Sequence, residues 1–542
     1  MSRPKPGMIF VFLLAVIAAL GGAALAKGAF LVAKHEGDTL HLLQMVFRMA
    51  DGEWPHLDFV TPIGILAVWP IALLVKAGLG VGQAILASQV LVALVFLLPV
   101  WWAAYSRFNN ALAYLFSGIV MVLILALVHG EANDLVSISM HYNRWAWAAA
   151  YVAIVLAVLP GVVARNDTAD GVIIGLCMAA LALTKVTYFI AFAPVVIIAM
   201  MLRGAARSLL IALAAGLAVL AVLTLFSGLS FWAAYLNDLL SVSGSEVRPQ
   251  PGAPLKTIIG APQYLGGSLA LITGVILLRQ AGEARLGLCL LLLVPGFFYV
   301  TFQNFGNDPQ WLMLLAIFLL MPRPEAEATN GFGWPLGRAL AVVAMATIAF
   351  AAPSVFNLAY SPFRHAALNA SDYTPMLANR PEHHDIRGRV VRSNRVDGNI
   401  ALDGPGSGLE DRAKLAKRDI TRARLNGEAL PDCELQLGLV GWFETIVDDL
   451  QANGYGDGKR IFAADIFNAH WLFSDVMRLP GGSPWYYGGL PGIEAADYVL
   501  VPMCPASLGI RKQILETIAE NSITLTELHR SPLYILLEMS EG

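Results

Sequence analysis

The chain carries little charge for its length. Only 14% of its 542 residues are Asp, Glu, Lys or Arg, 57% are hydrophobic, and the mean hydropathy is +0.64. Average soluble domains contain about a quarter charged residues, so this scarcity argues against an ordinary cytosolic protein. A long basic tract is also absent, which argues against a nucleic-acid partner.

Cysteine is scarce as well, with four residues. Cys177 and Cys289 lie inside apolar runs, where a thiol packs as a small hydrophobic group. Cys433 and Cys504 both lie in the polar last third of the chain. We therefore predict a disulfide between them, provided that this region faces an oxidising compartment. The sequence has no CxxC pair or Cys/His cluster that would indicate structural zinc.

The charge is concentrated near the carboxyl terminus. Residues from Tyr360 onward hold 18 of the 36 basic and 24 of the 39 acidic side chains. We expect a polytopic α-helical membrane protein, with a transmembrane domain over 1–359 and a soluble α/β domain over 360–542.

Apolar runs of the length that crosses a bilayer predict about eleven transmembrane helices. The expected ranges are 8–33, 83–105, 110–129, 145–164, 170–185, 186–202, 208–229, 257–278, 286–303, 310–322 and 336–358. The first is too long for a signal peptide and has no clean cleavage site, so we expect it to be retained. Residues 62–80 are expected to lie re-entrant or along the interface, because the arginines that follow the helices then fall on the cytoplasmic side, whereas a full crossing would move all of them outside.

That arginine bias predicts the orientation. It places the amino terminus in the cytoplasm and the C-terminal domain on the periplasmic face of a bacterial inner membrane. Chemistry is then expected in the outer loops.

The first outer loop contains Glu36, Asp38, Trp54 and Asp58. Leu40, Leu43, Val46, Phe47 and Ala50 repeat with helical spacing, which predicts an amphipathic helix along the membrane surface. Glu36 and Asp38 are expected just before this helix, where a carboxylate also serves as a simple helix cap.

The second outer loop gathers ionisable groups between two apolar helices. Its members are Glu131, Asp134, His141 and Arg144. Charges at such a depth are costly unless they pair or line a wet cavity, so a salt bridge and a functional site are both open. Lys185, at the outer end of a helical hairpin, either snorkels to the surface or meets an anionic headgroup or phosphate. A later loop adds Arg248 and Lys256, and serves as a donor-site cover or a plain connector.

The order of motifs in the first 200 residues resembles the GT-C superfamily of polyprenyl-phosphate-dependent glycosyltransferases. This superfamily includes protein O-mannosyltransferases and aminoarabinose transferases. The pattern is an Asp after the first membrane helix, an amphipathic stretch, Gly-x-x-Pro-x-x-Asp-Phe and a Pro-Ile-Gly turn. The matching positions are Asp38, Gly52, Pro55, Asp58, Phe59, Pro62 and Gly64.

This resemblance implies transfer of a sugar from a polyprenyl-phosphate donor to an envelope lipid, glycan or protein. Asp38 would be the general base, supported by Glu131 or Asp134. Lys185, Arg144 and His141 would bind the donor phosphate, with Arg248 and Lys256 in reserve. Glu36, Asp58 and Trp54 would support the acceptor or the loop. A divalent cation, Mg²⁺ or Mn²⁺, stays open, as do a transporter or flippase and a non-catalytic membrane scaffold.

The C-terminal third alternates helical and strand patterns. Helices are expected over 437–450 and 511–520, and strands over 460–464, 497–502, 522–528 and 533–539. It has no GxGxxG, P-loop or serine nucleophile elbow, so we expect no independent active site there. Trp471, Trp485, Tyr486 and Tyr487 either stack on sugar rings or form a packed loop.

Overall fold

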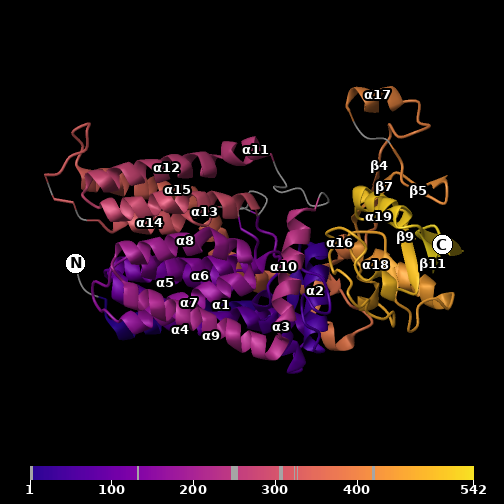
Figure 1. Ribbon diagram of the computed structural model, residues 1–542, viewed down its shortest axis with the longest axis horizontal. Helices are drawn as coiled ribbons and strands as arrows, with labels where there is room; N and C mark the ends of the chain where they lie inside the picture. The colour runs from indigo at the N-terminus through magenta and orange to yellow at the C-terminus, as the bar shows by residue number, and fades with distance from the viewer. Residues whose placement is uncertain are drawn as a thin grey trace.

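The computed structural model describes residues 4–130, 133–245, 254–303, 309–322, 324–325, 327–417 and 421–541. Apolar helices lie side by side along the longest axis of the molecule, and the C-terminal region caps one end of this bundle (Figure 1). The bundle helices are α1 (Pro6–Leu25), α4 (Val81–Arg107), α5 (Asn110–Leu125), α6 (His141–Val158), α7 (Asp167–Thr184), α8 (Val186–Leu202), α9 (Ala206–Ser227), α12 (Pro262–Gln280), α13 (Ala284–Gln303), α14 (Leu312–Leu320) and α15 (Leu336–Ala367).

Six helices in the described part of the chain are long and apolar enough to cross a membrane, namely α1, α4, α7, α9, α13 and α15. Helix α9 exposes large apolar side chains such as Leu217, Leu225 and Phe226. An apolar face of this extent suits lipid better than water. The structure is thus consistent with a membrane-embedded helical protein, and the count of eleven crossings stays a prediction.

One end of the bundle contains two arginines that share a carboxylate partner. At the amino-terminal end, the Trp101 indole donates to the Pro6 carbonyl at 2.9 Å. At the corresponding ends of α4, α7 and α8, Arg107 and Arg203 lie against the same carboxylate, Asp170. Two of the arginines that the sequence places on one side therefore share one end of the bundle, opposite the C-terminal region (Figure 1).

Residues 62–80 form a short 3-10 turn (Ile65–Ala67) and the eight-residue helix α3 (Trp69–Lys76). Eight helical residues span about 12 Å, less than half of the hydrocarbon thickness. This length favours the expected re-entrant or interfacial placement. The expected first helix, in contrast, is too long, because α1 ends at Leu25 and residues Phe30–Val32 form strand β1.

Helix α2 (Glu36–Ala50) differs from the surface helix expected in the first outer loop. It begins at Glu36, so Glu36 and Asp38 lie in its first turn rather than before it. Residues Thr39 to Arg48 are all buried. The polar face of α2 is covered because the C-terminal region packs on it, as the contact of Gln44 with the Pro484 carbonyl shows (3.0 Å). Sequence periodicity alone could not reveal that second covering layer.

The C-terminal region combines small sheets with two main helices, α18 (Leu439–Ala452) and α19 (Leu508–Glu520). The largest sheet has the order β10-β11-β9-β8, in which only the β8–β9 pair is parallel. Its strands are β8 (Ile461–Ala463), β9 (Tyr498–Pro502), β10 (Ile523–Arg530) and β11 (Tyr534–Glu541). The elements expected from alternating patterns are therefore present with shifted ends.

Smaller elements complete the fold. They are β2 (Tyr373–Pro375), β3 (Ile386–Arg389), β4 (Asp397–Ile400), β5 (Arg424–Leu425), β6 (Glu428–Ala429), β7 (Cys433–Leu437), α10 (Ser230–Ser243), α11 (Leu255–Gly260), α16 (Val390–Ser393) and α17 (Glu410–Leu415). Strand β1 pairs in parallel with β3, so a strand from the first outer loop completes a C-terminal sheet. The expected domain boundary at 359/360 lies within α15, which continues to Ala367.

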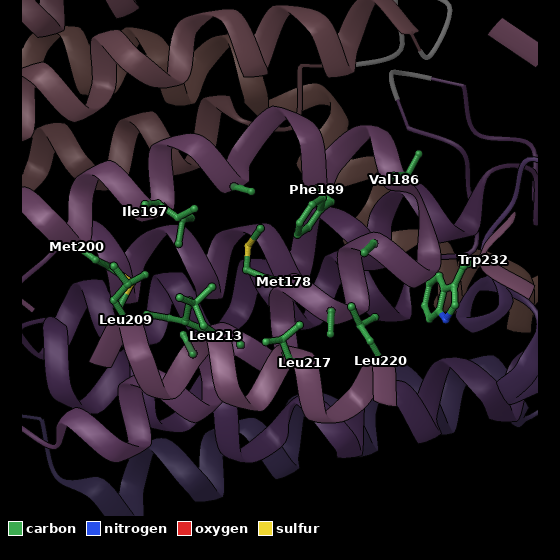
Figure 2. Close-up of a pocket in the computed structure, with 18 of the residues that line it drawn as sticks. Met178, Val186, Phe189, Ile197, Met200, Leu209, Leu213, Leu217, Leu220 and Trp232 are labelled. Carbon is green, nitrogen blue, oxygen red and sulfur yellow. The ribbon is translucent and has the colours of Figure 1, made fainter. Parts of the chain in front are cut away.

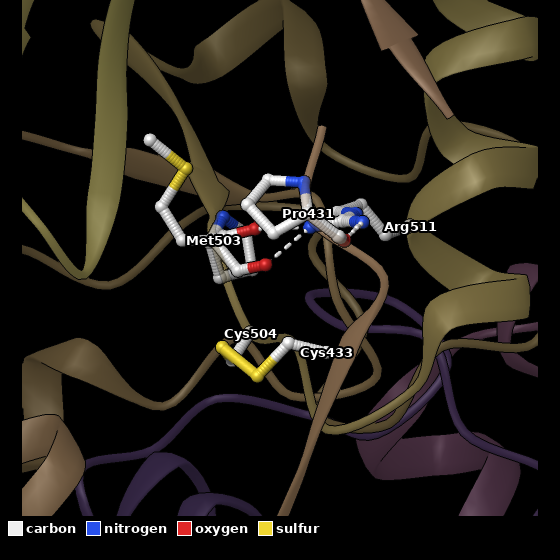
Figure 3. Close-up of a disulfide and its surroundings, with 6 residues drawn as sticks. Pro431, Cys433, Met503, Cys504 and Arg511 are labelled. Carbon is white, nitrogen blue, oxygen red and sulfur yellow. Dashed lines mark hydrogen bonds between the residues drawn. A yellow bond between two sulfur atoms is a disulfide. The ribbon is translucent and has the colours of Figure 1, made fainter. Parts of the chain in front are cut away.

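The expected disulfide joins Cys433 and Cys504, with Cα atoms 4.8 Å apart (Figure 3). Beside it, the Arg511 guanidinium donates to the carbonyls of Pro431, Pro502 and Met503. These bonds fasten strand β7 to the end of β9. The other two cysteines, Cys177 and Cys289, are buried free thiols, as their apolar surroundings predicted.

Candidate functional site

Asp38 lies where both outer loops and the C-terminal region meet. It occupies the first turn of α2, and the hydroxyl of Ser139 donates to its carboxylate. Ser139 belongs to the second outer loop, just before α6. The two loops are thus in contact at Asp38 through the Ser139 hydroxyl.

Asp134, one of the two acidic partners expected in the second loop, lies away from this contact. Asp134 is exposed, and its backbone carbonyl accepts a hydrogen bond from Arg364 at 3.2 Å. Asp134 lines neither of the two cavities that Asp38 lines. Glu131 lies outside the described residues, so its role stays a prediction.

Two cavities meet at Asp38. The first, which we call the inner pocket, has a volume of about 40 Å³ and is lined by His41, Ile63, Tyr142 and Trp485, among others. The second, the outer cleft, has a volume of about 290 Å³ and lies between the start of α2 and the C-terminal region. Asp38 and Trp485 line both cavities.

Lys185 lies between α7 and α8 in a third cavity of about 320 Å³, which we call the head pocket. Its ammonium donates to the Asn143 amide oxygen at 3.0 Å and lies 5.3 Å from the centre of the Tyr142 ring. The first residues of α8 also line this pocket, including Thr187, whose buried hydroxyl has no hydrogen-bond partner among the described residues. A lysine, a helix amino terminus and a hydroxyl together form a site suited to an anion.

An apolar groove of about 400 Å³, the tail groove, lies between α7, α8, α9 and α10 (Figure 2). Met178, Phe189, Leu213 and Leu217 point into it from three of these helices (Figure 2). Two polar groups belong to residues that line the groove, the Trp232 indole N–H and the Tyr235 hydroxyl, and both already donate hydrogen bonds within the protein. The groove therefore offers a purely apolar surface to its occupant.

The four cavities lie next to one another, and each shares lining residues with its neighbour. The tail groove and the head pocket share Val186, Leu236 and Leu239. The head pocket and the inner pocket share Ile63 and Tyr142. Because Asp38 lines both the inner pocket and the outer cleft, the order of the cavities is an apolar groove, a pocket with a lysine, a pocket with a carboxylate, and a cleft against the C-terminal region.

Two local features hold the segment 62–80, which follows the first outer loop, beside Lys185. The backbone amide of Gly64 donates to the Thr184 carbonyl at 3.2 Å, and a Cβ atom at Gly64 would overlap the Leu183 carbonyl oxygen. Only glycine permits this approach. His141, buried at the start of α6, bonds the Ala67 carbonyl at 2.8 Å and also lines the inner pocket.

The remaining expected phosphate-binding residues are placed otherwise. Arg144 is buried, and its guanidinium donates to the carbonyls of Ala126 and Val128. It therefore binds backbone carbonyls of the segment that follows α5, and it is not among the residues that line the head pocket. Lys256 is exposed in α11, and the head pocket does not include it. Arg248 lies outside the described residues.

The three supporting residues of the first loop have structural contacts. Glu36 is buried and forms a two-bond ion pair with Arg392, at 2.6 and 3.0 Å. The Asp58 carboxylate caps a turn by accepting from the Trp54 amide at 2.6 Å. Trp54 packs edge-on against Phe231 of α10. Only Glu36 lines a cavity that reaches Asp38.

The sequence did not single out His41, Ser139 or Tyr142 as part of the site. Ser139 and Tyr142 lie within the polar cluster of the second loop, so their position could have indicated that they belong to the site. His41 lies one helical turn after Asp38, on the same face of α2, which was a further signal. Thr187 gave no signal, because a threonine in an apolar helix is common.

Electrostatics near Asp38 favour a neutral histidine. Burial, together with the charge of the neighbouring Lys34, lowers the pKa of His35 to about 4. The His35 ring bonds the Ser137 hydroxyl at 2.9 Å, which helps to hold the second loop against α2. Within the described ranges, no group of three or more His, Cys, Asp or Glu side chains is arranged to hold a metal ion.

Comparisons with models of known families, with curated proteins and with solved structures found no match for this chain.

Proposed function

We propose that the protein is a membrane glycosyltransferase that moves a sugar from a polyprenyl-phosphate donor to a cell-envelope acceptor. The proposal places it in a bacterial inner membrane, with the amino terminus cytoplasmic and the C-terminal region periplasmic. The observation that supports it is the row of neighbouring cavities that runs from the apolar tail groove, by way of the pocket with Lys185, to the pocket with Asp38.

A lipid-linked sugar matches this series part by part. Its isoprenoid chain would lie in the tail groove, where each buried methylene contributes about 0.8 kcal/mol. Its phosphate would lie in the head pocket, between the Lys185 ammonium and the amino terminus of α8. The sugar would then reach toward the inner pocket and Asp38.

The reaction needs a base and a stabilised leaving group. An acceptor hydroxyl oxygen would form a bond to the anomeric carbon while its proton passes to the Asp38 carboxylate. The bond between that carbon and the phosphate oxygen would break, its electron pair staying on the phosphate. Lys185 and the α8 amino terminus would stabilise the resulting charge. Attack opposite the leaving phosphate would invert the anomeric configuration.

Ser139 would position the base. Its hydroxyl donates to one carboxylate oxygen of Asp38, which fixes the orientation of the group. The His41 ring lines the same inner pocket. In this mechanism the second outer loop contributes orientation through Ser139, while Asp134 takes no part.

Donor binding provides the test. A fluorescent short-chain polyprenyl phosphate would be titrated into the purified full-length protein in lipid nanodiscs. Lys185→Gln should weaken binding about tenfold or more, because one charge-assisted contact to phosphate is lost. Lys256→Gln is the matched control, an exposed lysine outside the head pocket, and should bind like the wild type. Equal affinity of all three proteins would remove the donor site from the proposal.

A further inference from the structure

The outer cleft lies on the far side of Asp38 from the tail groove. The start of α2, which includes Glu36, forms one wall together with Arg392, the ion-pair partner of Glu36. The other wall comes from the C-terminal region, namely the end of β7 and the side chains of Phe467 and Trp485. A molecule in this cleft would approach Asp38 from the side of the C-terminal region, away from the apolar helices.

Trp485 is the aromatic side chain that divides the outer cleft from the inner pocket. It is half-buried, whereas Trp471, Tyr486 and Tyr487 are buried. Of the four aromatic residues that the sequence offered for stacking on sugars, only Trp485 therefore keeps substantial exposure. It also lines the same two cavities as the proposed base.

The indole of Trp485 is held in a fixed position. The Phe467 ring contacts it edge-on at 5.0 Å between centroids, and the His41 ring lies 5.4 Å away. Phe467 in turn packs on the backbone of Gly37, where an added Cβ would lie 2.6 Å from the ring. The loop before Trp485 is fastened by the hydrogen bond from the Val60 amide to the Gly482 carbonyl, at 3.1 Å. A rigid aromatic face loses little entropy when it binds a ligand.

The chemistry around this indole suits a sugar ring. A pyranose presents C–H bonds on its face, which pack on an aromatic ring, and hydroxyls around its rim, which need hydrogen-bond partners. The cleft supplies such a partner in the exposed side-chain amide of Gln436. Its volume of about 290 Å³ is at the small end for ligand sites. It can hold one end of a saccharide chain but is too small to receive part of a folded protein.

A lipid acceptor fits this cleft less well. The apolar tail groove is on the opposite side of Asp38, and the Glu36–Arg392 ion pair lines the cleft. Burying an acyl chain against an ion pair would remove solvation from the charges without replacing it.

We infer that the outer cleft is a saccharide-binding site and that the acceptor of the transfer is a carbohydrate. One sugar ring stacks on Trp485 and turns a hydroxyl toward Asp38. This inference rests on the proposed function for the identity of the acceptor, whereas the binding site itself is measurable without any transfer.

The experiment is saturation-transfer difference NMR on the full-length protein in nanodiscs. The probes are disaccharides and methyl glycosides of glucose, galactose, mannose and N-acetylglucosamine. At least one probe should receive saturation on its ring protons from the wild type. Trp485→Ala should weaken its binding about tenfold. Trp334→Ala, an exposed tryptophan outside the four cavities, should leave it unchanged.

Trp485→Phe guards against a folding defect in the alanine variant, because phenylalanine keeps the packing against Phe467 and His41. It should bind the same probe with intermediate affinity. Absence of saturation on every probe with the wild type, or equal binding by the wild type and both Trp485 variants, would overturn the inference.

Failure of this inference differs from failure of the proposed function. If sugar transfer occurs to a lipid or peptide and Trp485→Ala does not slow it, the saccharide acceptor is refuted while the transferase stands. If saccharide binding depends on Trp485 but polyprenyl phosphate neither binds nor donates, the saccharide site is supported and the transferase is refuted.

Discussion

Loss of the Cys433–Cys504 disulfide should destabilise the C-terminal region by a calculable amount. The two residues are 71 positions apart, so the bond closes a long loop in the unfolded chain. For a loop of about 70 residues, the chain-entropy relation gives about 4 kcal/mol at 25 °C. For a region of this size, that free energy corresponds to a fall of about 8–16 °C in Tm.

The assay is thermal unfolding of the purified full-length protein in detergent, followed by intrinsic tryptophan fluorescence. Reductant should lower the Tm of the wild type, and the double variant Cys433→Ser/Cys504→Ser should show the same fall without reductant. Adding reductant to the double variant should change nothing further. Cys177→Ser, which removes a free buried thiol, controls for effects of cysteine replacement alone.

Two results would refute this reasoning. One is a reductant-induced shift below about 1 °C in the wild type, since the loop-closure stabilisation would then be missing. The other is alkylation of both thiols in denatured protein that was never reduced.

Three further predictions concern the structure around the site. Gly64→Ala should lower both Tm and donor affinity, because its Cβ would overlap the Leu183 carbonyl; unchanged Tm and binding would contradict this close packing. Glu36→Gln should cost about 1–3 kcal/mol in urea denaturation, because Arg392 loses a charge-assisted partner, and a loss below about 0.3 kcal/mol would show that the pair contributes little. Burial raises the pKa of Asp465 to about 7. Its protonated form is favoured in the folded state, so its contribution to stability is complete below pH ~4 and is lost as the pH rises to about 7. The Tm advantage of the wild type over Asp465→Asn should therefore be smaller at pH 8 than at pH 5, and an advantage independent of pH would contradict the shifted pKa.

Local sequence patterns predicted the helices well. Apolar runs longer than a few turns identified the bundle helices, because burial in lipid or protein demands uninterrupted apolar side chains. The ends were less predictable. Lys27 and Gly28 interrupt the apolar run after Leu25, and the apolar residues that follow form β1 because a distant strand, β3, is available for pairing.

The candidate site was only partly predictable, because its contacts join distant segments. The sequence offered Asp38, Lys185 and Trp485 as candidates, and the structure places Ser139 beside Asp38 and Tyr142 beside Lys185. Arg144 illustrates the limit. Its charge suggested phosphate binding, but its guanidinium donates to backbone carbonyls of the segment after α5. A sequence does not reveal which backbone groups lack partners until the helices have docked.

The central claim is that Asp38 is the base of a sugar transfer, and paired carboxylate variants test it most directly. Transfer of labelled sugar from a polyprenyl-phosphate donor would be measured in membrane vesicles for Asp38→Asn and Asp134→Asn, with donor binding measured in parallel. The account predicts that Asp38→Asn loses at least about a hundredfold in rate while still binding donor, and that Asp134→Asn transfers normally. Full transfer activity in Asp38→Asn would contradict the account.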